Sequence, residues 1–469
     1  MSMTLEPGRR RAIALATASV AMLLISFNAT ATNIAFPALQ DDFATYGLAS
    51  LSWIISAFNI TQTMMMLVGG RLADREGRRK IFLIGIAVLT VGSLLTGVAP
   101  TVPLLVAARV LQAVGAALVL PTSLAAVLPD FPVERRASVV SVWAGVGVFG
   151  ATAAPSLGAV IVELSGWRAI FLSIVPICVL AFMFGRATMT ESRPEARPAR
   201  LDLVGAVQGT AALGLLALGV VQGPRWGWTS SATMGALIGA LILGPAFVHR
   251  CRTQSEPLLN LTLFHHRTFT IATLASAFLA VSTTATWFLY PLFMSRVWGY
   301  STWEIGLAIT PGPAVMVFVN LWAGRQADRR GYRRLMTVGA SLACLGTLWL
   351  ALFFREGNGY VLGFLPATLT IGIGMGLSMG PMNSAALRDV SEEILGEANA
   401  AYNTVRSFGS ALGVAFVVAV LGDQGGSGLP DAFVQAFFLS LVLMLVAPLL
   451  IGFAYPRDHC GSKDVSAVS

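Results

Sequence analysis

Long apolar runs divide the chain at fourteen places, and they constrain its fold more than any other feature. Each run covers about 20 residues, the length that an α-helix needs to cross roughly 30 Å of hydrocarbon. Because 55% of the 469 residues are hydrophobic and 12% are charged, one water-soluble core cannot bury their apolar surface. This excludes a soluble enzyme and predicts an all-α polytopic membrane protein. The predicted spans are 12–38, 50–70, 81–99, 103–128, 137–162, 167–185, 203–222, 231–249, 269–295, 302–323, 335–354, 360–387, 397–421 and 433–455.

The basic residues fall in every second connection between these runs. With a cytoplasmic amino terminus, 25 of the 31 Lys and Arg residues lie in cytoplasmic connections or tails, as the positive-inside rule requires. Four arginines lie in connections on the opposite side, and Arg109 and Arg406 lie inside runs. We expect both termini in the cytoplasm, and the net charge of +8 to face anionic lipid headgroups rather than nucleic acid. Ala29-Thr30-Ala31 imitates a signal cleavage site, but the apolar run continues past it and we expect no cleavage.

One connection is repeated. Residues 70–80 read GRLADREGRRK and residues 324–334 read GRQADRRGYRR, which agree at seven of eleven positions. A repeat of this kind indicates two related helical bundles with a substrate site between them near the bilayer midplane. The glycines permit a tight turn, Asp74 and Asp328 can face the positive end of a helix, and the arginines hold the loop on the cytoplasmic side.

These two loops resemble the signature loop of the major facilitator superfamily, and the resemblance extends over nearly the whole chain. Further segments make it similar to the fourteen-span drug:proton antiporters of that superfamily. They are Asn33-Ile34-Ala35-Phe36-Pro37, Trp53, Arg109-Val110-Leu111-Gln112 with Gly115, Pro155-Ser156-Leu157-Gly158, Trp167-Arg168-Ala169-Ile170-Phe171, Trp226-Gly227-Trp228, Pro257-Leu258-Leu259 with Leu263-Phe264, and Asn403-Thr404-Val405-Arg406. The resemblance implies two six-helix bundles, over 1–185 and 269–455. Linkers and two inserted helices would occupy 186–268, and a cytoplasmic tail 456–469.

The repeated loops are the expected site of conformational gating. Asp74 and Asp328 should form cytoplasmic ion pairs with nearby arginines that hold one conformation and break in the other. The residues expected to take part are Asp74, Arg75, Gly77, Arg78, Arg135, Asp328, Arg329 and Gly331.

The fifth run carries small residues four apart. Gly150, Ala154 and Gly158 would let another helix approach closely, and Pro155 removes one backbone donor beside them. The segment resembles the antiporter motif of the family and is expected to hinge or seal, with plain close packing as the alternative. Ala154 and Ala159 stand where the family typically has glycine.

Arginines within apolar runs predict a central cavity. Because an Arg at membrane depth costs about 2.5–3.5 kcal/mol on insertion scales, Arg109 and Arg406 should each face a cavity or a partner. Gln112 lies one helical turn from Arg109. Asn28 lies at a similar depth in the first run, where many relatives have Asp, so Asn28 and Arg109 are expected to face each other. We expect Asn28, Arg109, Gln112 and Arg406 to form the central cavity or coupling site.

The acidic residues lie near the span ends or in loops, so the runs contain no deep carboxylate. Antiport usually needs such a group, because an amide such as Asn28 cannot titrate. Asp41 and Glu163 are the reserve candidates for a proton site. A basic cavity without a carboxylate should favour neutral or anionic amphiphiles over organic cations.

We therefore predict a secondary transporter of the bacterial cytoplasmic membrane. We expect it to export small amphipathic compounds by alternating access, linked to protons, and to act as a monomer. The alternatives are an uncoupled facilitator, a dedicated exporter of a neutral or anionic metabolite or lipid and, more remotely, a membrane sensor. The sequence contains no phosphate loop, nucleophile motif or metal-ligand spacing, so we expect no enzyme activity, metal or cofactor.

Overall fold

The computed structural model describes residues 6–192, 202–254, 257, 259–355, 357, 359–390, 395–421 and 429–456. These residues form helices and turns, without a strand among them, which confirms the all-α prediction. The predicted tail beyond residue 456 and the linker segment 193–201 lie outside the described residues. The helices are α1 (Pro7–Ile34), α2 (Phe36–Asp42), α3 (Leu48–Glu76), α4 (Arg78–Val98), α5 (Val102–Val127), α6 (Val133–Ser165), α7 (Arg168–Thr188), α8 (Leu203–Trp226), α9 (Ser231–Thr253), α10 (Arg267–Arg296), α11 (Thr302–Ile309), α12 (Pro311–Arg330), α13 (Tyr332–Phe353), α14 (Leu365–Leu387), α15 (Leu395–Leu421) and α16 (Leu429–Leu449).

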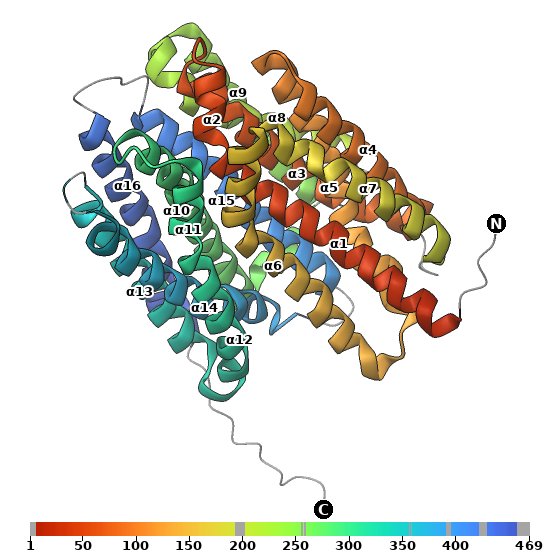
Figure 1. Ribbon diagram of the computed structural model, residues 1–469. Coiled ribbons are helices and arrows are strands. Elements are labelled where there is room, and N and C mark those ends of the chain that lie inside the picture. Colours follow the sequence, from red (N-terminus) through yellow and green to blue (C-terminus); the bar gives the residue numbers. More distant parts are fainter. Residues whose placement is uncertain are drawn as a thin grey trace, which may run out of the picture.

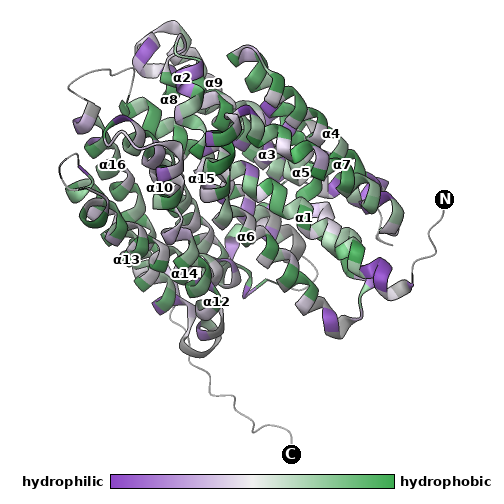
Figure 2. Ribbon diagram, in the orientation of Figure 1, coloured by the Kyte–Doolittle hydropathy of each residue, from purple (hydrophilic) through white to green (hydrophobic). Residues whose placement is uncertain are grey.

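The helices form two groups with a pair between them (Figure 1). In the first group, α5 packs on α3 and α4, and α1 packs on α6 and α7. In the second group, α14 packs on α12 and α13, while α10 packs on α15 and α16. Helices α8 and α9 pair with each other, and α8 contacts both α3 and α15. Apolar residues cover most of the helical length, and hydrophilic ones gather near helix ends (Figure 2), as expected for helices that cross a bilayer.

Thirteen helical segments in the described part of the chain are long and apolar enough to cross a membrane. A fourteenth candidate, α3, bends by 42° between Met66 and Val68. Gly69 and Gly70 follow the bend and weaken the helix locally. Every predicted run falls on a helix, while the count of fourteen crossings stays a prediction.

The repeated loops make the same turn in both groups. Gly77 separates α3 from α4 with φ +111°, and Gly331 separates α12 from α13 with φ +85°. An L-residue with a side chain rarely adopts this conformation, so glycine is required for the chain to reverse there. The side of the molecule that carries these loops is called the basic side below.

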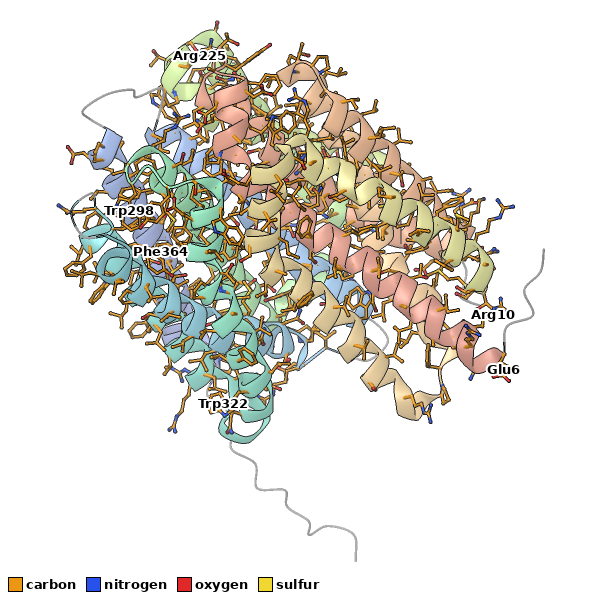
Figure 3. All side chains as sticks on the ribbon, in the orientation of Figure 1. Glu6, Arg10, Arg225, Trp298, Trp322 and Phe364 are labelled. Atoms are coloured by element: carbon orange, nitrogen blue, oxygen red, sulfur yellow. The ribbon has the colours of Figure 1, made fainter. Side chains whose placement is uncertain are left out.

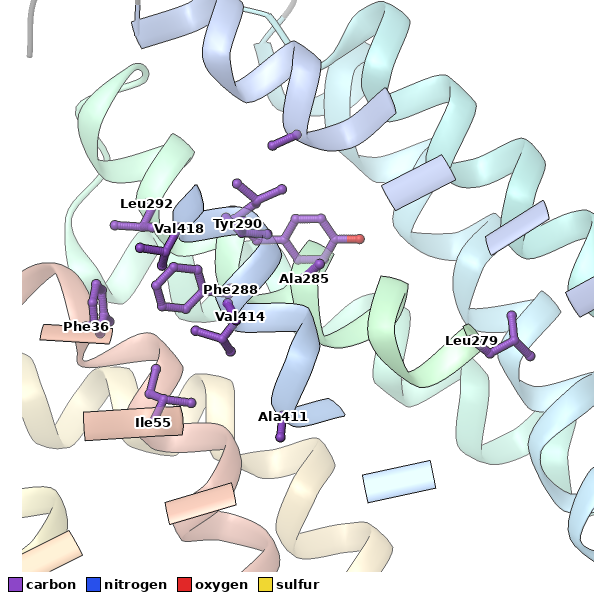
Figure 4. Close-up of a cluster of buried hydrophobic side chains, with 14 of the residues drawn as sticks. Phe36, Ile55, Leu279, Ala285, Phe288, Tyr290, Leu292, Ala411, Val414 and Val418 are labelled. Atoms are coloured by element: carbon purple, nitrogen blue, oxygen red, sulfur yellow. The ribbon is translucent and has the colours of Figure 1, made fainter. Parts of the chain in front are cut away.

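On the side opposite the basic loops, the two groups meet in an apolar seal. Phe36 of the first group and Phe288 of the second have ring centroids 4.8 Å apart, and Figure 4 shows these rings among buried side chains from both groups. Ser156 of α6 hydrogen-bonds Thr310, between α11 and α12, at 2.5 Å. Asp41 pairs with Arg296 across the groups at 3.1 Å. Figure 1 shows α6 and α12 diverging from this seal towards the basic side.

Candidate functional site

A cavity of about 700 Å³ lies between the two groups of helices. Its walls come from α1, α3, α4, α5 and α6 of the first group, from α15 of the second, and from Pro257, Leu259 and Asn260. The lining includes Gly70, Arg71, Ala73, Asp74 and Arg78 of the first repeated loop, so the cavity lies on the basic side of the seal. A cavity of this size suits a single small molecule.

The wall that α15 contributes is polar. Arg406 donates from Nη2 to Oδ1 of Asn403 at 3.2 Å, and Asn403 donates from Nδ2 to Oδ1 of Asn399 at 3.0 Å. Asn383 of α14 also donates to Oδ1 of Asn399, at 3.3 Å. The Nε atom of Arg406 is buried without a hydrogen-bond partner among the described residues. Donor capacity on this wall is therefore left over.

The facing wall, from the first group, is largely apolar at α1, α5 and α6. Met22, Met66, Leu120, Leu124 and Trp143 line it. Methionine side chains adapt to varied shapes, and an aromatic ring offers a broad apolar surface. This wall can therefore hold an apolar body without fixing its outline.

The rim of the cavity carries paired charges. The guanidinium of Arg78 lies 3.3 Å from the carboxylate of Asp74, which is four residues earlier in the chain. Arg71 donates a hydrogen bond to the Pro257 carbonyl. Arg75 lies 3.7 Å from Glu76, and Arg135 is exposed. The structure therefore places the carboxylate of Asp74 beside Arg78 within the repeated loop.

The corresponding loop in the second group gives less information. Gly331 makes its expected turn, whereas the side chains of Asp328 and Arg329 lie outside the described residues. Gating by these loops stays a prediction.

Arg109 lies in a different place from the cavity, enclosed by the first group of helices. Its side chain donates to Oδ1 of Asn28 at 2.6 Å, to Oε1 of Gln112 at 2.5 Å and to the Ile54 carbonyl at 3.0 Å. Gln112 in turn donates to Ser93 Oγ at 2.8 Å. The acceptors come from α1, α3 and α5, so one guanidinium ties three helices together.

Two rings and a close helix contact complete this buried network. The guanidinium lies 4.1 Å from the ring centroid of Phe58 and 5.4 Å from that of Phe171. Cation–π contacts of this kind stabilise a charge by about 0.5–2 kcal/mol. A Cβ on Gly92 would lie 2.6 Å from the Gln112 backbone, so glycine there lets α4 and α5 approach and places Gln112.

The structure thus separates the four residues expected in the central cavity. Arg406 lines the cavity. Asn28, Arg109 and Gln112 are 2%, 1% and 0% exposed and form a buried cluster instead. Their placement corrects the expectation of one shared site, because the polar face of α5 at Arg109 points into its own bundle. The sequence analysis did not predict Asn399 and Trp143 as site residues, because neither belongs to a motif. The spacing of Asn399, Asn403 and Arg406, one helical turn apart, could have indicated a polar face that includes Asn399.

Close packing surrounds the small residues of α6. A Cβ on Gly150 would lie 2.7 Å from the Leu23 carbonyl oxygen, and one on Gly158 would lie 3.1 Å from the Ala31 side chain, both in α1. Pro155 faces the second group, where a Cβ on Gly306 would lie 2.5 Å from its carbonyl oxygen. Helix α6 is therefore wedged between α1 and α11, in the seal.

The reserve proton sites lie away from Arg109. Glu163 is exposed on α6, and Asp41 pairs with Arg296. Next to it, Asp42 accepts hydrogen bonds from Trp167 at 3.0 Å and Arg168 at 2.7 Å. These bonds hold the pKa of the Asp42 carboxyl below its usual value, so Asp42 stays ionised at physiological pH.

Curated proteins that are similar to most of this chain include resistance and export proteins. The multidrug resistance protein Stp of Mycobacterium tuberculosis is 31% identical over 456 residues, which cover 97% of this chain and 84% of that protein. The cephamycin export protein CmcT of Amycolatopsis lactamdurans is 33% identical over 458 residues, covering 94% and 93%. The tetracenomycin C resistance and export protein of Streptomyces glaucescens is 27% identical over 418 residues, covering 89% and 77%.

Solved structures share the fold at low sequence identity. A bacterial homologue of the human lysosomal transporter Spinster superposes with a TM-score of 0.69 at 16% identity, covering 95% of this chain and 97% of the other. The xylose transporter XylE from E. coli gives 0.64 at 16% identity, covering 95% and 100%. The model of the Major Facilitator Superfamily matches residues 18–414, and again residues 272–467. The chain is a member of the Major Facilitator Superfamily.

Proposed function

We propose that the protein is an efflux transporter, which moves small amphipathic, drug-like compounds out of the cytoplasm by alternating access. The observation that carries this proposal is the cavity between the two groups, with a polar wall on α15 and an apolar wall opposite. The similarity to multidrug and antibiotic exporters over most of the chain supports the same direction of transport.

The basic side is proposed to be cytoplasmic, with both termini on that side of a bacterial inner membrane. The positive-inside rule supports this orientation. The described conformation then faces inward, ready to take up a compound from the cytoplasm. Export requires the seal around Phe36 and Phe288 to open while the basic side closes, with the halves 1–185 and 269–455 rocking about the cavity.

The proposed energy source is a proton gradient, as the resemblance implies. An uncoupled facilitator is the competing function, and one observation favours it. The acceptors that hold Arg109 are two amide oxygens and a backbone carbonyl, and none of them titrates near neutral pH. The reserve carboxylates Asp41 and Glu163 are the candidates left for coupling.

Reconstitution tests both functions. The purified protein in proteoliposomes should move a fluorescent amphiphile across the bilayer, and an imposed pH gradient should drive it against its concentration gradient. Uptake that only equilibrates the compound, with or without the pH gradient, would establish the facilitator. A vesicle that moves no amphiphile in either condition contradicts transport.

A further inference from the structure

We propose that Arg406, with the amides of Asn399 and Asn403, forms a head-group subsite in the cavity, and that its cargo is an amphipathic carboxylic acid. This inference rests on the proposed function and narrows it to one chemical class. Three observations carry it: the unused donor capacity of Arg406, the direction of the amide chain, and the apolar wall opposite.

Donor capacity comes first. An arginine has five N–H donors in a planar fork, and within the described part of the chain Arg406 makes one hydrogen bond, to Asn403. Its Nε is buried without a partner, and none of the ion pairs among the described residues includes Arg406. A guanidinium whose charge is not compensated costs free energy at membrane depth, and a carboxylate that accepts from the Nη donors left over offsets that cost.

The amide chain does not neutralise Arg406. Each amide oxygen in the chain faces a donor: Oδ1 of Asn403 accepts from Arg406, and Oδ1 of Asn399 accepts from Asn403 and Asn383. The oxygens are therefore occupied, and the chain presents no negative charge to the cavity.

The remaining charges in the cavity do not cancel Arg406. The described lining contains three arginines and one acidic residue, Asp74. Asp74 lies at the rim with 49% of its side chain exposed and is paired with Arg78. A cation therefore meets a positive interior, whereas an acid meets an attractive one.

The apolar wall fixes the orientation of the cargo. With its head at Arg406, the body of the molecule extends towards Leu120, Leu124 and Trp143. A compound that is polar throughout would leave this wall unfilled, and an uncharged one would leave Arg406 unpaired. An acid with an aromatic or aliphatic body satisfies both walls at once.

The test uses three probes of nearly equal apolar area: 2-naphthylacetate, its uncharged amide, and 2-naphthylmethyl-trimethylammonium. Binding to the purified full chain is measured by equilibrium dialysis, and transport is measured in proteoliposomes. The protein should bind the acid at least about tenfold more tightly than the amide or the cation, the size expected for a charge-assisted pair. Equal affinities, tighter binding of the cation or no saturable binding of the acid would overturn the proposal.

Two variants locate the subsite. Arg406→Gln should weaken acid binding about tenfold and change amide binding less than about twofold. Asn403→Asp keeps the shape of the side chain and places a carboxylate beside Arg406, so it should abolish the acid preference and improve cation binding. If Arg406→Gln does not fold, Asn403→Asp still tests whether the acid binds at this subsite. Arg225→Gln is the matched control, since Arg225 is exposed at the far end of the molecule from Arg10 (Figure 3). If the control and the two variants alter acid binding alike, the proposal fails.

Two further arms separate the possible causes of failure. Vesicles that transport the probes without preferring the acid contradict the subsite and leave efflux standing. Arg406-dependent binding of the acid with no transport of any probe leaves the subsite standing and contradicts efflux. Added phosphatidylglycerol should not displace the acid, and full displacement would assign the subsite to a lipid headgroup instead.

Discussion

Replacing Asn28 with leucine removes one of the three acceptors that hold the buried guanidinium of Arg109. The lost bond joins a charged donor to a neutral oxygen at 2.6 Å, and such a bond contributes about 1.5–3 kcal/mol. Because Arg109 is 1% exposed, water cannot take the place of the amide. We expect Asn28→Leu to lower the free energy of unfolding by about 2 kcal/mol or more.

The second arm of this experiment removes the charge. Arg109→Met leaves the oxygens of Asn28 and Gln112 without their donor, which costs about 1–3 kcal/mol for each. In the Arg109→Met background, Asn28→Leu removes an unpaired oxygen rather than a partner, so it should cost little or restore stability. The two substitutions should therefore be coupled by about 2 kcal/mol or more.

Equilibrium unfolding in mixed micelles measures the four free energies of this cycle. Transport per folded molecule is measured on the same samples. Additivity of the two substitutions to within about 0.5 kcal/mol would refute the reasoning, because the contact would then contribute nothing specific. Wild-type transport in the folded double variant would establish Arg109 as an anchor for three helices and exclude it from coupling.

Three further predictions follow from the backbone and from the seal. Gly306→Leu should separate the two groups at the seal, because a Cβ there would lie 2.5 Å from the Pro155 carbonyl oxygen; spin labels on the two groups should report a longer distance, and an unchanged one contradicts this. Gly331→Ala should lower the free energy of unfolding by about 1 kcal/mol, since φ there is +85°. Gly324→Ala, in open space within α12, should be neutral or stabilising, and equal effects of the two would be inconsistent with a required turn. Asp42→Asn should destabilise the protein equally at about pH 5 and about pH 8. The indole of Trp167 and the guanidinium of Arg168 hold the folded-state pKa of Asp42 below 3.8. The ionised carboxylate therefore contributes its full stability above that value, and this stability is lost only as the pH falls through the folded-state pKa. A stability difference that shrinks between pH 8 and pH 5 would show a higher pKa.

The lengths of the helices follow from the sequence, and their interruptions do not. Every predicted run became helical because twenty apolar residues in a bilayer must satisfy their backbone groups internally. The breaks that separate α1 from α2 and α11 from α12 lie inside predicted runs. A proline can occupy the first position of a new helix, and it can also kink a helix that continues through it. Pro311 alone therefore could not show that a new helix, α12, begins there.

The sequence predicted the depth of the site residues along their helices, but not the direction in which their side chains point. The rise per residue placed Asn28 and Arg109 at the same level, and the structure joins them at 2.6 Å. The same arithmetic cannot say which way a side chain points around a helix that is apolar on all sides. From α5, Leu120 and Leu124 line the cavity, about 16 Å and about 22 Å along the helix from Arg109, whereas Arg109 points into its own bundle.

The two intramembrane arginines show why one sequence rule has two outcomes. Each guanidinium costs about 2.5–3.5 kcal/mol to place at membrane depth, and the protein must offset that cost in every conformation. Arg109 is offset permanently, by three acceptors and two rings from its own bundle. Among the described residues, Arg406 has a single amide acceptor and a buried Nε without one, so its compensation is incomplete in the conformation whose cavity lies on the basic side. Because Arg406 lacks a full set of hydrogen-bond acceptors in this conformation, its free energy depends on whether the cavity holds a ligand. The free energy of Arg109 does not, because its acceptors belong to the protein.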